Sequence, residues 1–135
     1  MPVLTITPDS AFGILLLARQ FDVKVPQTDP DSGSNPSDDG SVDALEFGAH
    51  DDTRRELVSL VSDLNDDEQA DLIALVLLGC GDFTLAEWDE ARQEGRDLGR
   101  AHIPGTIAGI PLVSDYLEEG LSLFGESIAD YLDRH

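Results

Sequence analysis

Basic residues are scarce in this sequence, and lysine is almost absent. The 135 residues include 8 Lys and Arg against 28 Asp and Glu, which leaves a formal net charge of −20 at pH 7, and Lys24 is the single lysine. A surface of this charge repels nucleic-acid phosphates and anionic membranes, so we expect no direct binding to either. It attracts basic proteins and divalent cations. The alternative is that the acids only keep the surface solvated, or adapt it to a salty cytoplasm.

Cysteine and long apolar runs are also scarce. Cys80 is the single cysteine, so no internal disulfide can form, and a lone thiol is normal in a reducing compartment. The longest apolar runs, ILLLA from Ile14 and LIALVLL from Leu72, are far shorter than the ~18 residues that cross a bilayer. The first ten residues lack the basic and apolar regions of a secretory signal. We therefore expect a cytoplasmic protein.

The patterning that is present predicts one all-α domain over residues 1–135, a compact bundle of about five helices with one long acidic loop. A chain of this length commonly forms one domain and buries roughly two-thirds of its unfolded surface. Since aromatic residues make up only 6% of the chain, aliphatic side chains must fill the core. Helical periodicity predicts helices over residues 8–21, 51–64, 66–79, 85–98 and 111–124, with a last short turn after Ser127.

Capping residues predict where these helices begin and end. Thr7 and Pro8 suit the N-cap and the first turn of the first helix. Asn65, followed three residues later by Glu68, predicts a capping box at the start of the third. Gly79 is expected to end that helix in the left-handed conformation.

The stretch GCGDFTLAEWDEA, residues 79–91, looks like a calcium loop that runs into its exiting helix. Alignment of Gly81 with the invariant loop glycine places Leu78 and Cys80 where oxygen ligands are required. Thr84 and Glu87 instead have the spacing of a capping box. We therefore predict a joint between two helices, not an ion site.

Most of the predicted helices have one apolar face. The helix over 66–79 is apolar nearly all round, which predicts burial between neighbours. The helix over 85–98 is expected to carry a mixed charged face outward, and HIPGTIAGIP, residues 102–111, is expected to be a packed connection broken by Gly and Pro. The stripes expected to face the core are Leu57, Val58, Leu60, Val61 and Leu64; Leu85, Trp88, Ala91, Gly95 and Leu98; and Leu112, Val113, Tyr116, Leu117, Leu121 and Phe124.

Catalytic and metal-binding patterns are missing. The three histidines are scattered, no CxxC or HxxxH pair occurs, and adjacent acids such as Asp66 and Asp67 point to different faces of a helix. The acidic loop lacks the EF-hand spacing, since Ser34 and Gly40 occupy the required Gly and Glu positions. We predict no catalytic residue, no metal ligand and no cofactor, and an enzyme is the less favoured function.

Protein–protein interaction is the favoured function, with a basic protein as the partner. The loop over residues 26–41, PQTDPDSGSNPSDDGS, has no aliphatic or aromatic side chain to bury, and a loop this long is functional or mobile. It and the DYLEEGL segment form the candidate interaction surface, with Asn35, Asp38, Asp39, Asp115, Glu118 and Glu119 as its residues. A small-molecule-binding protein or an enzyme of unknown reaction is the alternative, and the oligomeric state stays open.

Several stretches resemble the bacterial domain-of-unknown-function family DUF3775. They are LTITPDSA from Leu4, SNPSDDG from Ser34, DLNDDEQADLIAL from Asp63, GDFTLAEWDEA from Gly81 and PLVSDYLEEGL from Pro111. Where the family is expected to have Gly-Arg-Gly-Asp, residues 79–82 read Gly-Cys-Gly-Asp. The resemblance implies a small bacterial cytoplasmic protein and brings no assigned activity, cofactor or catalytic residue.

The resemblance also implies that the SNPSDDG loop is more than a linker. We expect Asn35, Asp38 and Asp39 to fold back onto helix ends. A variant with both Asp38→Ala and Asp39→Ala should then have a lower melting temperature, and an unchanged melting temperature would contradict this.

Overall fold

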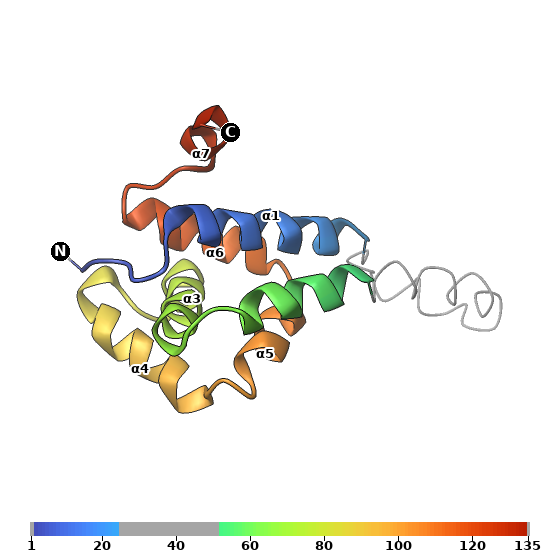
Figure 1. Ribbon diagram of the computed structural model, residues 1–135. Helices are drawn as coiled ribbons and strands as arrows, with labels where there is room; N and C mark the ends of the chain where they lie inside the picture. Colours follow the sequence, from blue (N-terminus) through green and yellow to red (C-terminus); the bar gives the residue numbers. More distant parts are fainter. Residues whose placement is uncertain (1, 25–51, 135) are drawn as a thin grey trace, which may run out of the picture.

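A computed structural model describes residues 2–24 and 52–134 of the chain (Figure 1). The 26–41 loop, with Asn35, Asp38 and Asp39, lies outside the described residues. Within those ranges every regular element is a helix, which confirms the all-α class. The elements are α1 (Pro8–Lys24), a helix over residues 52–62, α3 (Asp66–Gly79), the short 3₁₀ turn η2 (Leu85–Glu87), α4 (Trp88–Leu98), α5 (Ile103–Gly109), α6 (Val113–Leu123) and α7 (Ile128–Arg134).

Helix α3 is the central element, and α4 and α6 pack against it (Figure 1). Its residues from Gln69 to Val76 are all buried, as the apolar circumference predicted. The predicted capping box is confirmed. The N–H of Glu68 donates to Asn65 Oδ1 at 2.8 Å, and the N–H of Asn65 donates to Glu68 Oε1 at 2.9 Å. This reciprocal bonding satisfies N–H groups that the first turn leaves without helical partners.

Glycines let the neighbours approach α3 closely. At Gly120 of α6, a Cβ would overlap the Leu75 carbonyl oxygen, and at Gly95 of α4 it would lie 2.9 Å from Ala70 Cα. The prediction for Gly79 was wrong, because Gly81 takes the left-handed conformation with φ 91°. Gly79 is instead the last residue of α3, where a Cβ would overlap the Tyr116 backbone.

The two terminal helices meet at one end of the bundle. Helix α1 packs against α6 and begins as predicted, with Thr7 Oγ1 accepting the Ser10 N–H at 3.1 Å. Helix α7 lies next to α1 through the rings of Phe12 and Tyr131, whose centroids are 5.1 Å apart. The short turn expected after Ser127 is therefore a helix of two turns with its own contact to the core.

The segment between α4 and α6 differs in part from the prediction. The 102–111 segment packs as predicted, since Ile103 and Ile107 are buried, but it contains helix α5 where a connection broken by Gly and Pro was expected. Pro104 lies in its first turn, where a proline removes no helical hydrogen bond.

Three leucines expected in the core are partly exposed instead. Leu60 is 39% exposed, Leu98 is 37% and Leu112 is 41%. Leu112 has φ 59° and precedes α6, which begins two residues later than expected, so its side chain leaves the buried face. Leu60 and Leu98 lie at the edges of their apolar stripes, where a small difference in helix rotation decides burial.

None of the described helices is long and apolar enough to cross a membrane.

Candidate functional site

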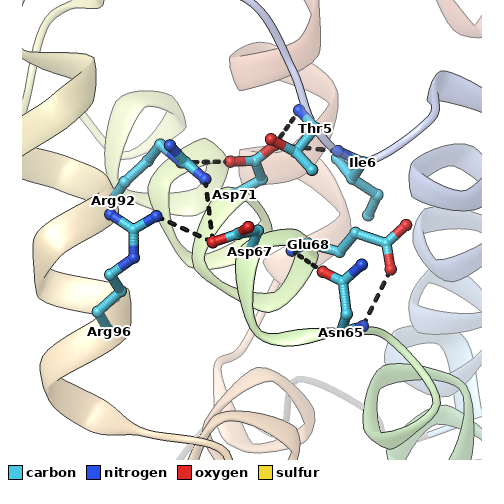
Figure 2. A network of polar contacts seen from close by, with 8 residues as sticks. All are labelled: Thr5, Ile6, Asn65, Asp67, Glu68, Asp71, Arg92 and Arg96. Carbon is cyan, nitrogen blue, oxygen red and sulfur yellow. Dashed lines mark hydrogen bonds and ion pairs between the residues drawn. The ribbon is translucent and has the colours of Figure 1, made fainter.

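A row of opposite charges joins α3 to α4. We call it the charged seam and define it by Asp66, Asp67 and Asp71 on one side and Arg92, Arg96 and Arg100 on the other. Arg92 and Arg96 are four residues apart and lie along one face of α4, and Arg100 lies two residues beyond the end of that helix. Figure 2 shows the inner part of the seam. The arginines of α4 therefore face the acidic first turns of α3.

Asp71 is the innermost residue of the seam and is fully buried. Its Oδ1 lies 2.5 Å from Arg92 Nε, and Arg92 is itself only 17% exposed. Its Oδ2 accepts the backbone N–H groups of Thr5 and Ile6, the latter at 3.0 Å (Figure 2). A buried carboxylate is tolerated only when its charge is compensated; Arg92 supplies the opposite charge, and the two N–H groups supply hydrogen bonds to Oδ2. Asp71 thereby fixes the N-terminal segment to α3.

The outer pairs of the seam are more exposed. Arg96 donates to Asp67 Oδ1 at 2.9 Å, and Arg92 also lies 3.8 Å from that oxygen. Arg100 donates to Asp66 at 3.0 Å and to the carbonyl oxygens of Ser62 and Leu64 at 2.9 and 2.8 Å. Arg100 therefore also ties the end of the 52–62 helix to the seam.

A cavity of about 440 Å³ opens beside the outer pairs, between the first turn of α3, the end of α4 and the start of α5. It is lined by Asp66, Asp67, Gln69, Arg96, Arg100 and Ile103, together with two glycines of the α4 end. Gln69 is fully buried, and its Nε2 donates to the Val61 carbonyl oxygen at 2.8 Å. Its Oε1 has no hydrogen-bond partner among the described residues.

Helix α4 also carries four acids outside the charged seam. Asp89, Glu90, Glu94 and Asp97 are all exposed, and we call these four residues the α4 acidic face. The ion pairs within the described residues leave these carboxylates without a cationic partner. The charged residues of α4 therefore divide by pairing, since Arg92 and Arg96 pair with acids of α3 and these four acids have no cation.

The predicted α6 residues are partly engaged within the fold. Arg19 of α1 donates to Glu118 at 2.7 Å and to Asp115 at 3.1 Å, while Glu119 is exposed. The hydrogen bond from Glu118, together with the charges of both carboxylates, raises the pKa of Arg19 against the opposing effect of burial. Two of the three predicted residues therefore join α1 to α6. Their role in an interaction stays a prediction, as does that of Asn35, Asp38 and Asp39 outside the described residues.

The stretch that looks like a calcium loop is a helix joint. Glu87 Oε1 accepts from the Thr84 N–H at 2.8 Å and from its hydroxyl at 3.2 Å, so this carboxylate serves the start of η2. Cys80, between α3 and this turn, is exposed. Across residues 2–24 and 52–134, no group of three or more His, Cys, Asp or Glu has a geometry suited to a metal ion.

Three residues of this site, Asp71, Arg92 and Gln69, were not predicted from the sequence. One signal for them was available, because Gln69 and Asp71 are polar positions in a helix expected to be buried all round. Arginines at every fourth position from Arg92 were a second signal, since this spacing marks one helix face. The acid with which each arginine pairs depends on how α4 crosses α3. The spacing of the arginines in the sequence does not determine this crossing.

The comparisons with known proteins give a family and no activity. Residues 54–125 match the family model described as "Protein of unknown function (DUF3775)", and the chain belongs to this family. The match includes α3, α4 and α6 with the whole charged seam, and it excludes the LTITPDSA and SNPSDDG stretches. Searches of curated proteins and of solved structures found no match.

Proposed function

We propose that this protein is a cytoplasmic interaction module that docks a basic partner protein through the α4 acidic face. The observation that carries the proposal is the group of four exposed acids on α4. Arg92 and Arg96 pair with acids of α3, which leaves Asp89, Glu90, Glu94 and Asp97 exposed and without a cationic partner among the described residues. The single cysteine agrees with the reducing compartment named in the proposal.

A helix face of this kind recognises a partner chiefly through long-range attraction. Each exposed pair contributes only about 0.2–1 kcal/mol, so affinity requires several pairs together. Complementary charge mainly raises the association rate and orients the partner, and both effects weaken as salt screens the charges. The expected partner therefore carries several Lys or Arg side chains on one face and dissociates at high salt.

The test compares protein capture by matched variants in a bacterial lysate. Glu90→Gln with Glu94→Gln removes two charges from the α4 acidic face. Asp52→Asn with Glu56→Gln removes two charges from the exposed side of the 52–62 helix and serves as the control. We expect a basic protein to be retained by the wild type and by the control at low salt, released at high salt, and lost from the α4 variant.

Equal retention by both variants would show that only the net charge matters and would contradict docking at α4. Retention of no basic protein would favour the alternative that the acids only solvate the surface. A third variant, Glu118→Gln with Glu119→Gln, tests the α6 surface predicted from the sequence. Loss of the partner from this variant alone would move the docking site to α6.

A further inference from the structure

Gln69 is a buried polar side chain with an unmet acceptor. Its Nε2 donates to the Val61 carbonyl oxygen at 2.8 Å, and this bond requires nitrogen at that position, so the remaining atom is the oxygen. The other buried atoms without aligned hydrogen bonds, Asp71 Oδ1 and Arg92 Nε, lie 2.5 Å from each other and compensate one another's charge. Gln69 Oε1 has neither a donor nor a cation among the described residues. A buried unmet acceptor costs about 1–3 kcal/mol, so it calls for an explanation.

The cavity beside Gln69 offers both signs of charge. Asp67 and Arg96 pair at 2.9 Å on its lining, and Asp66 and Arg100 pair at 3.0 Å on its rim. Arg100 is also fixed by two backbone carbonyls, whereas Arg96 has one ion pair among the described residues and is 43% exposed. A guanidinium has five N–H donors, so Arg96 has donors to spare and freedom to move.

We propose that this cavity binds a small zwitterion that carries an ammonium and a carboxylate, the chemistry of a free amino acid. The ammonium donates to Gln69 Oε1 and to the Asp67 carboxylate. The ligand carboxylate accepts from Arg96, which moves with it and so admits the ammonium to the buried oxygen. Ile103 and the glycines of the α4 end provide room for the ligand's carbon atoms.

The balance of charge favours a zwitterion over a singly charged ligand. The lining has two carboxylates and two guanidiniums, so its net charge is zero although the whole chain carries −20. A lone amine or a lone carboxylate would displace one half of an ion pair and leave the other half without a partner. A zwitterion replaces one ion pair by two and also satisfies Gln69. The volume of about 440 Å³ falls within the range of small-ligand sites.

The test is calorimetric titration of the 135-residue chain with each standard L-amino acid. Ethylamine and acetate, which carry one charge each, serve as control ligands. We expect at least one amino acid to bind, and both control ligands to bind at least about tenfold more weakly, since each lacks one charge-assisted contact. Absence of binding by every amino acid would overturn the proposal, as would binding of either control with equal affinity.

Variants locate the binding. Arg96→Gln should weaken binding at least about tenfold, whereas Arg55→Gln, the same change at an exposed arginine of the 52–62 helix, should leave it unchanged. Gln69→Leu should also weaken binding about tenfold, and circular dichroism shows whether it folds. If it does not fold, Arg96→Gln decides the question. Binding that Arg96→Gln leaves intact, or that Arg55→Gln weakens equally, would overturn the assignment to this cavity.

Discussion

Asp71 shows how one carboxylate can organise distant parts of a helical domain. It is fully buried and holds Arg92 on one oxygen and the N–H groups of Thr5 and Ile6 on the other. If Asp71 were replaced by an apolar residue of similar size, those partners would be left buried and unpaired. The cost of removing such a charge lies mainly in the partners that stay behind. Asp67 forms the same kind of pair at the exposed end of the seam, where water substitutes for a lost partner.

The two aspartates therefore predict very different costs for one chemical change. Asp71→Asn should lower the free energy of unfolding by about 3 kcal/mol, because Arg92 loses its buried counter-charge. Asp67→Asn should lower it by less than about 1 kcal/mol, since that side chain is 58% exposed. Urea unfolding followed by circular dichroism measures both values. Equal losses in the two variants would show that burial does not govern the strength of the seam.

At the scale of the helices, glycine sets how closely α3 is packed. Gly95 and Gly120 bring α4 and α6 close to the α3 backbone, and Gly79 does the same from α3 itself. These three residues occur within helices, where glycine costs about 1 kcal/mol relative to alanine. Close helix packing compensates for that cost. The sequence alone gives no reason to separate them from Gly13, a helical glycine with nothing within 4 Å of its missing Cβ.

Alanine substitution should therefore have opposite effects at two helical glycines. Gly120→Ala places a Cβ against the Leu75 carbonyl oxygen, forces α6 away from α3 and should destabilise the fold by roughly 2–3 kcal/mol. Gly13→Ala meets open space in α1 and should stabilise it by roughly 0.5–1 kcal/mol. Thermal and urea unfolding of both variants measure these changes. A neutral Gly120→Ala would mean that α6 does not pack on α3 as described.

An interaction could be predicted from the sequence when its partners are close together along the chain. The capping box of Asn65 and Glu68 spans three residues, so the pattern contains all of it. Helix α5 was missed because Gly and Pro usually interrupt helices, although Pro104 occupies a turn where it does no harm. The pairing of Asp71 with Arg92 depends on the crossing of two helices, which no local pattern records.

At the scale of the whole molecule, the few basic residues are concentrated at joints between elements. Arg19, Arg92, Arg96 and Arg100, half of the eight bases in the chain, each pair with an acid of another helix. Within the described part of the chain, the acids outside these pairs are largely exposed, and they repel one another. Self-repulsion of this size opposes the compact state.

Salt should therefore raise the stability of this protein. Screening shortens the range of repulsion from about 10 Å at 0.1 M salt to about 3 Å at 1 M. A gain of about 1 kcal/mol raises the melting temperature of a domain this size by a few degrees. A melting series in sodium chloride measures the effect, and the variant with Glu90→Gln and Glu94→Gln should show a smaller slope. A flat response in the wild type would show that self-repulsion does not limit stability.

The attachment of the N-terminal segment has a consequence for the order of assembly during synthesis. Thr5 and Asp71 are 66 positions apart, and Arg92 is later still. The segment that holds Thr5 and Ile6 leaves the ribosome before α3 and α4 do. It reaches its final place only after both have formed, because its contacts with Asp71 close a long loop. This segment is therefore made before the helices that hold it, and until it is fixed it remains accessible to chaperones and proteases.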